Sequence, residues 1–468
     1  MRITVKLSAW LSGFLDRLRK YDDKNLQRDR RDWMRQSIWE RDVEFPSFPK
    51  LEGDIKTDVL VIGGGLCGVL CAWFLKQAGV DYVLVEGDAV GRGVTCNTTA
   101  KITSQHGLIY EKLLRTQGKE KALQYLDANQ WALGKYRELA EETECDFEEK
   151  DAFVYTLTDW QKIEREVQAL ETLGFPAEFV QEVNLPFDTE GAVKFLRQAQ
   201  FQPRRFLAYI SRDLNIYEHT FIQELAPGCA RYDGGTITAR RMIAATHFPF
   251  LKKHGAYFLK LYQHRSYVMA LKNVSDVRGM YVDEAQKGMS FRNYKNYLLV
   301  GGGSHRTGRK GGGWEELQEF VQEYYGIGKA GYYWATQDCM SLDGIPYIGE
   351  YSPNTPGLYV ASGFGKWGMT TSMAAAHILT EMICGRETGW EAVFDPSRSI
   401  WKPQLFVNTL EALAGLLTPT MKRCPHMGCA LKWNPQEHTW DCSCHGSRFE
   451  EDGKLINNPA AGDANVAK

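Results

Sequence analysis

A glycine-rich turn follows the first long apolar segment of the chain. Residues 59–68 read VLVIGGGLCG, in which Gly63, Gly65 and Gly68 have the spacing G-x-G-x-x-G. Gly63 allows a tight turn, Gly65 lets the backbone approach a pyrophosphate, and Gly68 lets the following helix pack closely on its strand. The N–H groups at the start of that helix favour phosphate. Glu86 ends the next apolar segment, about 20 residues further on, where an acidic side chain binds ribose hydroxyls. The pattern predicts a dinucleotide site.

Cysteine and histidine residues form a second chemical motif near the C-terminal end. Four of the eleven cysteines lie between residues 424 and 444, and the other seven are scattered singly. Scattered cysteines are expected to be reduced core thiols. Within the cluster, Cys424 and His426 form C-x-H, and Cys442 and His445 form C-x-x-H. Such a cluster indicates a metal site, and two thiolates with two imidazoles suit tetrahedral zinc as well as an iron–sulfur centre.

The order and flanks of these motifs resemble the cluster loops of Rieske [2Fe–2S] proteins of the cytochrome-bc type. Trp440-Asp441 before the second loop and Gly446-Ser447-Arg448-Phe449 after it favour this family over a zinc knuckle. The resemblance implies that one iron is held by two thiolates and the other by two imidazoles, from Cys424, His426, Cys442 and His445. It also implies a disulfide between Cys429 and Cys444 that ties the two loops together.

Three departures from the Rieske family are visible. Ser443 replaces the usual Pro, and Phe449 replaces a Tyr, whose missing hydrogen bond is expected to lower the cluster potential. In place of the strands that usually precede the first loop, residues 405–421 read as a short helical connector. A truncated module of about 45 residues needs its metal and its disulfide to fold, and we expect it to lean on the rest of the chain.

Residues 55–390 resemble the D-amino-acid-oxidase-like family of FAD-dependent oxidoreductases. Downstream of the glycine turn, residues 91–101 (GRGVTCNTTAK), 244–247 (AATH), 343–349 (DGIPYIG) and 363–369 (GFGKWGM) follow one another in the order of that family's flavin-contacting elements. In the last of these, a glycine-rich loop opens a helix whose N-terminus would stabilise the negative charge of reduced flavin. The resemblance implies FAD contacts at Gly63, Gly65, Gly68, Glu86, Thr98, Thr99, Gly363, Gly365 and Gly368.

The substrate side is less defined by the sequence. Candidates for the flavin face are His247, His305, Arg306, Lys366 and Trp367, and each of these also has an ordinary structural interpretation. Members of this family oxidise a C–H bond next to an amine, which requires little acid–base help if the amine binds neutral. The catalytic residue therefore stays unknown at this stage.

The elements needed to position these motifs predict an α/β protein. Strands are expected at 58–62, 81–86, 236–246, 297–300 and 358–361, and helices at 68–79, 111–142, 159–173 and 370–384. By resemblance, a Rossmann-type FAD-binding domain (about 55–105, 200–250 and 297–400) is interleaved with an α+β substrate domain (about 106–200 and 251–296). This body spans residues 37–400, and a linker at 401–420 joins it to a small β-rich Rieske module at 421–468.

Composition and charge narrow the class of protein further. The 56 basic and 58 acidic residues give a net charge of −2, which provides no basic excess for a nucleic-acid partner. Residues 1–36 form a charged extension whose Leu7, Leu11, Phe14, Leu15 and Leu18 follow helical spacing. No small-residue cleavage site follows them. We expect this helix to dock on the protein or a partner; peripheral contact with a membrane is the alternative, and the location is expected to be cytoplasmic.

Taken with the resemblances, the two motifs predict an FAD-dependent dehydrogenase that oxidises a small amine, amino acid or related donor. Its electrons would pass from FAD to the [2Fe–2S] cluster and on to an external acceptor, either a ferredoxin-like protein or a quinone. One alternative is a non-enzymatic redox sensor or scaffold with an incompletely loaded cluster, suggested by the truncated module. A Rieske oxygenase-like enzyme is disfavoured because no pair of histidines at short helical spacing occurs outside the cluster.

Overall fold

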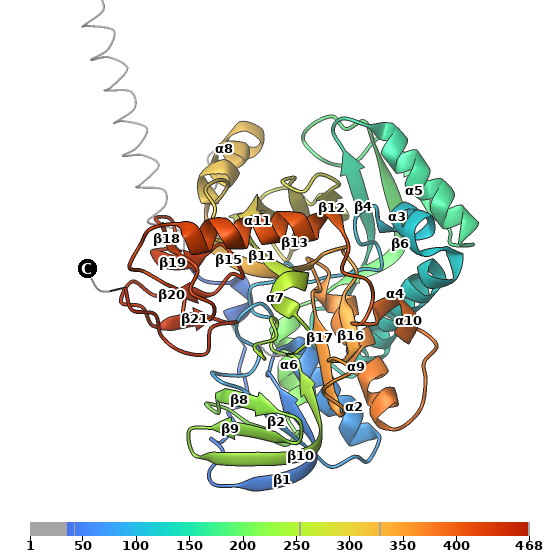
Figure 1. Ribbon diagram of the computed structural model, residues 1–468. Coiled ribbons are helices and arrows are strands. Elements are labelled where there is room, and N and C mark those ends of the chain that lie inside the picture. The colour runs from blue at the N-terminus through green and yellow to red at the C-terminus, as the bar shows by residue number, and fades with distance from the viewer. Residues whose placement is uncertain (1–34, 42, 252–253, 327–328, 467–468) are drawn as a thin grey trace, which may run out of the picture.

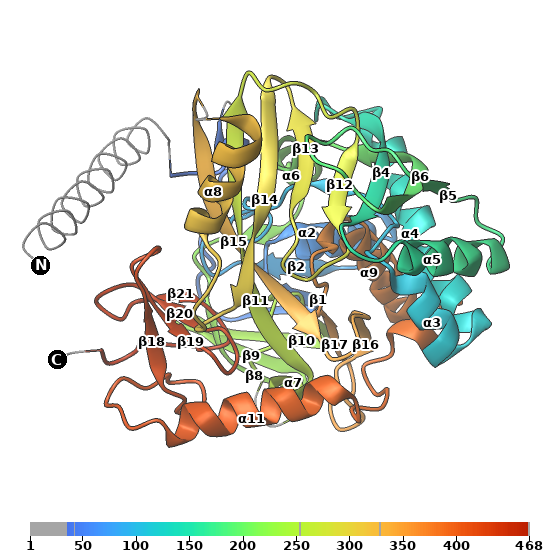
Figure 2. The ribbon, with the colours of Figure 1, turned by 90° about the horizontal axis from the view of Figure 1, so that it is seen from above.

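The computed structural model describes residues 35–41, 43–251, 254–326 and 329–466 (Figures 1 and 2). The helix expected in the N-terminal extension falls almost entirely outside these residues. The first described element is a short 3-10 helix, η1 (Ile38–Glu40), whose Trp39 is fully buried. Two large sheets and one small sheet follow.

The first sheet carries the glycine turn. Its strand order is β16-β17-β10-β1-β2-β7, with β9 paired to β10 and β8 paired to β9. The strands β1, β2, β10 and β17 run parallel and are rich in buried Val, Ile and Leu, as is usual for parallel strands covered on both faces. The bounds are β1 (Ile55–Ile62), β2 (Tyr82–Val85), β7 (Ile216–Tyr217), β8 (Ile222–Ala226), β9 (Cys229–Tyr232), β10 (Gly235–Ala244), β16 (Tyr347–Glu350) and β17 (Leu358–Ser362).

The second sheet is mostly antiparallel and has the order β15-β11-β14-β13-β12-β4-β6-β3, with β5 beside β6. Its two longest strands, β11 and β15, pair with each other in antiparallel fashion along most of their length. The bounds are β3 (Lys101–Ile102), β4 (Glu148–Thr156), β5 (Glu178–Val180), β6 (Gly191–Gln200), β11 (Leu261–Lys272), β12 (Met280–Asp283), β13 (Ser290–Tyr294), β14 (Tyr297–Arg306) and β15 (Lys329–Ser341).

The helices cover the two large sheets. Helix α2 follows the glycine turn and packs on α9, which also contacts α4. The helix expected over 111–142 is divided in two, because Gly118 adopts a φ of +85° between α3 and α4. The bounds are α2 (Leu66–Gln77), α3 (Ile109–Gln117), α4 (Lys119–Ala140), α5 (Trp160–Thr172), α6 (Pro203–Ser211), α7 (Tyr257–Lys260), α8 (Trp314–Tyr325), α9 (Gly368–Ile383) and α10 (Glu391–Phe394).

The C-terminal module is a four-stranded antiparallel sheet preceded by a helix. Helix α11 (Pro403–Leu417) lies across the outside of the molecule in both views and leads into the module (Figures 1 and 2). The strands β18 (Leu431–Asn434), β19 (Thr439–Cys442), β20 (Arg448–Phe449) and β21 (Leu455–Asn457) pair in sequence order. The expected fold class, an α/β flavoprotein body with a small β-rich module, is confirmed.

One part of the sequence-based division differs from the sheet arrangement. Strands β14 and β15 fall within residues 297–400, which we expected in the FAD part, yet both pair with β11 in the second sheet. The cause is local: Tyr294 pairs with Tyr297 across a turn of two residues, so β14 must continue the sheet that contains β13. Among the described residues, no helix is long and apolar enough to cross a membrane.

Candidate functional site

In the turn between β1 and α2, each of the three motif glycines is required for a different structural reason. Gly63 has a φ of +110°, and a Cβ there would lie 2.6 Å from the carbonyl oxygen of Ala245. A Cβ on Gly68 would lie 1.8 Å from the carbonyl oxygen of Gly63, so this position must be bare for α2 to pack. A Cβ on Gly65 would approach only Thr95 Oγ1, at 3.4 Å. The backbone at Gly65 therefore faces open space, and the lack of a side chain there leaves room for a pyrophosphate to approach it.

Glu86 lies at the end of β2, beside this turn. Its Oε2 accepts a hydrogen bond from the Gly64 N–H at 2.6 Å, and its Oε1 accepts one from the Asp88 N–H at 2.8 Å. Burial raises the pKa of Glu86. A carboxylate has about four lone-pair sites, so these two bonds leave acceptor capacity for ribose hydroxyls.

The glycine turn and Glu86 both line a large cavity. Its volume is about 1440 Å³, above the usual range of roughly 300–1,000 Å³ for ligand pockets. Thr98 and Thr99 line it, and so does the loop that opens α9. In that loop Gly363 and Gly365 have positive φ, and α9 begins at Gly368 without a side-chain cap, which leaves its first N–H groups available. The bare Gly65, the uncapped helix start and the volume fit a flavin dinucleotide.

One part of the cavity wall is polar and buried. Lys366 Nζ donates to Ser304 Oγ at 2.8 Å, and Ser266 Oγ donates to Asp338 at 2.9 Å. Burial lowers the pKa of Lys366 and raises that of Asp338. Lys101 lies on the same cavity, and burial, with the positive charges of Arg292 and Lys366, lowers its pKa to about 7. Two ammonium groups thus share a site with one carboxylate.

The structure separates the candidates that the sequence suggested for the flavin face. His247, Lys366 and Trp367 line the cavity, and burial lowers the pKa of His247 to about 4. His305 does not belong to the lining: its ring stacks on Tyr267 at 5.7 Å, and its Nδ1 lies 3.0 Å from the Arg306 carbonyl oxygen.

Arg306 likewise turns away from the cavity. Its guanidinium donates to the carbonyl oxygens of Ser443 and Cys444 in the C-terminal module, at 3.2 and 3.3 Å. Of the last three residues of β14, Ser304 lines the cavity, whereas His305 and Arg306 do not. Sequence reasoning missed Ser304, and it also missed Ser266 and Asp338, which isolated strand sequences do not mark.

His106 is another cavity residue that sequence reasoning missed. Its ring stacks on Trp367 with centroids 5.1 Å apart, and its two nitrogens contact Tyr125 Oη at 2.6 Å and the Thr103 carbonyl oxygen at 2.9 Å. Burial lowers the pKa of His106 to about 3, so its imidazole is neutral at physiological pH. It lies five residues after the segment 91–101, so extending that motif by five positions would have included it.

The predicted cluster ligands converge in the C-terminal module. Cys424, His426, Cys442 and His445 are all buried. The rings of His426 and His445 have centroids 4.9 Å apart, and the side chains of Cys424 and Cys442 contact each other. His445 Nδ1 is buried without a hydrogen-bond partner, as expected of a nitrogen that binds a metal. Two thiols and two imidazoles in one buried place fit a Rieske centre.

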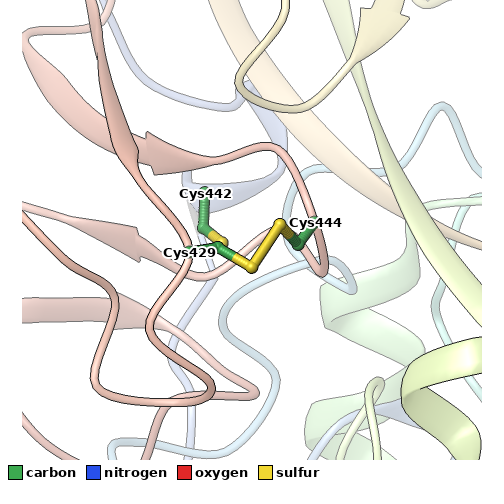
Figure 3. A group of neighbouring side chains, drawn as sticks. All are labelled: Cys429, Cys442 and Cys444. Atoms are coloured by element: carbon green, nitrogen blue, oxygen red, sulfur yellow. A yellow bond between two sulfur atoms is a disulfide. The ribbon is translucent and has the colours of Figure 1, made fainter. Parts of the chain in front are cut away.

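A disulfide links the two cluster loops. Figure 3 shows Cys429 joined to Cys444, with the sulfur of Cys442 beside them. These three sulfurs lie within 4.8 Å of one another, but the disulfide leaves Cys442 as the thiol that can bind metal. Gly415 of α11 packs directly on this bridge, because a Cβ there would lie 2.6 Å from Cys444 Sγ.

The cluster loops lie on the flavoprotein body beside the cavity. Asn458 Nδ2 donates to the carbonyl oxygens of Thr246 and Phe248, at 2.7 and 2.8 Å. The Phe248 ring contacts those of His426 and His445, with centroids 6.5 and 6.2 Å away. Residues 245–247 line the cavity, and so do residues 452–458 of the C-terminal module. One short segment, residues 245–248, therefore contacts both the cavity and the cluster histidines.

A buried ion-pair network fixes this docking. Glu437 accepts hydrogen bonds from Arg265 Nε at 2.9 Å and from Arg448 Nη2 at 2.8 Å. Arg265 belongs to the body, whereas Glu437 and Arg448 belong to the C-terminal module. Burial alone would raise the pKa of Glu437, but the two arginines outweigh it and hold that pKa at about 2.

Comparison with known proteins agrees with this geometry. A model of the FAD dependent oxidoreductase family matches residues 58–382, and a model of the Rieske [2Fe-2S] domain matches residues 398–467. The chain is 33% identical over 488 aligned residues to YhfW of Bacillus subtilis (strain 168), named as a Rieske 2Fe-2S iron-sulfur protein. That alignment covers 91% of this chain and 96% of YhfW.

Two solved structures show the same fold in the body. Glycine oxidase from Geobacillus kaustophilus aligns with a TM-score of 0.63 at 19% identity, over 74% of this chain and 99% of that one. L-proline dehydrogenase from P. horikoshii aligns with a TM-score of 0.60 at 16% identity, over 74% of this chain and 98% of that one. The chain therefore belongs to the FAD dependent oxidoreductase family and carries a Rieske [2Fe-2S] domain at its C-terminal end.

Proposed function

We propose that the protein oxidises a small amine or amino-acid donor and passes the electrons through its cluster to an external acceptor. When bound, FAD would supply two-electron chemistry as a hydride acceptor, and the [2Fe–2S] cluster would carry single electrons. The observation that carries the proposal is the shared segment, residues 245–248. It lines the cavity at one end and contacts the cluster histidines through Phe248 at the other.

The polar wall supports a donor that bears a carboxylate. Lys101 and Lys366 are buried cations on the cavity; burial lowers both pKa values, and the positive charges of Arg292 and Lys366 lower that of Lys101 further. A bound carboxylate would relieve that repulsion and raise the pKa of Lys101 from about 7, so that binding of the anion is coupled to uptake of a proton. The names of the two solved relatives, an oxidase of glycine and a dehydrogenase of L-proline, support the same donor class.

The neutral imidazoles of His106 and His247 fit an amine donor. With pKa values of about 3 and 4, neither ring carries a positive charge at neutral pH that would oppose hydride loss from the donor. The stacked Trp367 and His106 rings lie on the cavity wall, and in the proposed reaction they would help to exclude water from the reacting bond.

A donor screen tests the proposal. Purified, FAD-loaded protein is mixed anaerobically with amines, amino acids and 2-hydroxy acids, and bleaching of flavin absorbance is followed by stopped flow. We expect bleaching by carboxylate-bearing amines, and we expect Lys366→Met to raise KM for those donors far more than for amines without a carboxylate. An equal rise of KM for both donor types would exclude Lys366 as the carboxylate contact.

Electron exit is tested by the same mixing followed by electron paramagnetic resonance of freeze-quenched samples. After donor addition, the signal of a reduced Rieske centre should develop with the rate of flavin bleaching or more slowly. Full bleaching of the flavin without any cluster signal would remove the cluster from the route.

A further inference from the structure

The outer face of α11 is the largest group of apolar side chains that the described residues expose. Nine of the eighteen exposed large apolar side chains in the described part of the chain lie between 401 and 427. Leu410 is 66% exposed, Leu417 is 80% exposed, and Trp401, just before the helix, is 75% exposed. Soluble surfaces carry such residues singly, and contiguous groups of them mark a binding face.

The exposed apolar side chains cover about half of the helix circumference. Phe406, Leu410, Leu413 and Leu417 follow i, i+4, i+7, i+11 spacing and form a central stripe. Val407 and Leu416 flank the stripe on its two sides, because each residue advances roughly 100° around an α-helix. The opposite side packs inward through Leu405, Asn408 and Gly415.

Charges are confined to the rim of this face. Glu411 is the only charged residue within α11, and it pairs with Arg309 from the loop after β14. Lys402 precedes the helix, and Lys422 and Arg423 follow it, so cations bracket the apolar face at both ends. The face is thus apolar in the middle and positive at its margins.

We propose that this face docks on the surface of an anionic lipid bilayer. An in-plane amphipathic helix needs a wide apolar arc, flanking cations and an interfacial aromatic side chain, and α11 with Trp401, Lys402 and Lys422 supplies them. The Arg423 guanidinium instead donates to the carbonyl oxygens of Leu416 and Thr418 at the end of the helix. With 15 residues, α11 is too short to span a bilayer, which takes about 20, so it lies in the plane of the interface.

Two features argue against a second copy of the chain as the occupant. A helix–helix seam uses a narrow stripe, whereas here the exposed arc extends to Val407 and Leu416. A two-fold antiparallel pairing of α11 would also bring Lys402 of one helix next to Lys422 and Arg423 of the other, which is repulsive.

Docking would bring the cluster close to the membrane. The buried Gly415 packs on the Cys429–Cys444 bridge, so the helix that meets the lipid is also the helix that covers the cluster loops. The exposed Met421 and Met427 extend the apolar face onto the first of those loops. An acceptor dissolved in the bilayer, of the quinone class, would then meet the electron exit directly; this consequence rests on the proposed function, whereas lipid docking does not.

Flotation of the full-length holoprotein with vesicles tests the docking. Vesicles of phosphatidylglycerol and phosphatidylcholine in equal amounts are compared with vesicles of pure phosphatidylcholine. We expect co-flotation with the anionic vesicles, weaker binding to neutral ones, and weaker binding at high salt. In the double variant Leu410→Glu/Leu417→Glu the partition coefficient should fall by about a hundredfold or more, because two large apolar side chains no longer enter the lipid.

The matched control is Leu157→Glu/Leu196→Glu, which changes two exposed leucines of the second-sheet region and should bind as the wild type does. Flavin and cluster absorbance establish that each variant is folded. Failure of the wild type to float, or unchanged flotation of the Leu410/Leu417 variant, would overturn the proposal. So would a wild-type dimer that becomes a monomer in that variant and does not bind vesicles, since the face would then belong to a second copy.

Discussion

The contact that holds the cluster domain on the flavoprotein body can be broken by a single isosteric change, Glu437→Gln. Glu437 is 6% exposed and Arg265 is 4% exposed, so water does not replace the lost charge. The carboxylate also accepts a hydrogen bond from Tyr267 Oη at 3.1 Å. The amide NH₂ group of glutamine would face the N–H groups of one arginine, so that hydrogen bond would be lost. The neutral amide would also leave a buried guanidinium without its counter-charge.

The size of the effect follows from the burial of all three charged groups. Removing one partner of a buried ion pair costs about 3–5 kcal/mol, because the remaining charge stays desolvated. At about 1.4 kcal/mol per factor of ten, the docking equilibrium should shift by roughly a hundred- to a few thousandfold. Arg448, within the module, stays near residue 437 after undocking, so part of the cost persists in the undocked state and the lower figure is the better expectation.

Acid should mimic the substitution. The pKa of Glu437 is about 2 in the folded protein and about 4.3 in an unfolded chain. A depressed carboxyl pKa stabilises the folded form above the unfolded value, so this contribution is complete above about pH 4.3 and is lost as pH falls toward 2. The wild type should therefore lose docking in that window, and Glu437→Gln should show little further loss there.

Hydrogen exchange at β11 and the rate of cluster reduction after flavin reduction both report docking. In Glu437→Gln we expect faster exchange over residues 263–267 and slower cluster reduction, with flavin reduction unchanged. Glu451→Gln, which removes an exposed acid of the same domain, is the control and should behave as the wild type. If both variants match the wild type in both measurements, the ion pair does not hold the domain and the reasoning is refuted.

Further predictions concern the two cofactor sites. Gly65→Ala should fold normally but bind FAD at least tenfold more weakly, because its methyl group enters the pyrophosphate approach; FAD titration measures this. Gly68→Ala should instead lower the melting temperature of the apoprotein by several degrees, since its Cβ would meet the Gly63 carbonyl oxygen; equal stability of the two variants would contradict the assignment. His445→Ala should lose the Rieske signal in electron paramagnetic resonance while its flavin still bleaches with donor, and reoxidation by a one-electron acceptor should slow steeply. Lys101→Met should abolish any transition near pH 7 in KM for a carboxylate donor, measured as KM against pH.

The sequence predicts well those sites whose functional residues lie close together along the chain. The β1–α2 turn is complete within ten residues, and two short loops supply the cluster ligands, so pattern and spacing suffice. The Cys429–Cys444 link came from family resemblance, since spacing alone allows other pairings.

The polar wall was missed for a physical reason. Ser266, Ser304 and Asp338 come from three strands, β11, β14 and β15, and meet only through the register that sets Arg265 opposite His305 and His264 opposite Asp338. Nothing in any one strand marks its inward side chains. His305, which the sequence suggested, lies outside the cavity, whereas its neighbour Ser304, which the sequence did not suggest, lines it.

The truncation of the cluster domain makes sense only together with the body. Gln263 and Gln337 of the body donate to the carbonyl oxygens of His445 and Gly446, each at 2.8 Å, and so satisfy backbone groups that an isolated module would have to pair within its own sheet. A Cβ on Gly308 of the body would lie 2.6 Å from the Ser443 backbone nitrogen. The cluster loop is thus completed by β11, the loop after β14, and β15. Swinging away would leave these backbone groups of the domain without their partners on the flavoprotein, so the docked position is favoured. If the cluster carries electrons as proposed, we expect it to receive and release them in the docked position, with its acceptor at the exposed side of the domain.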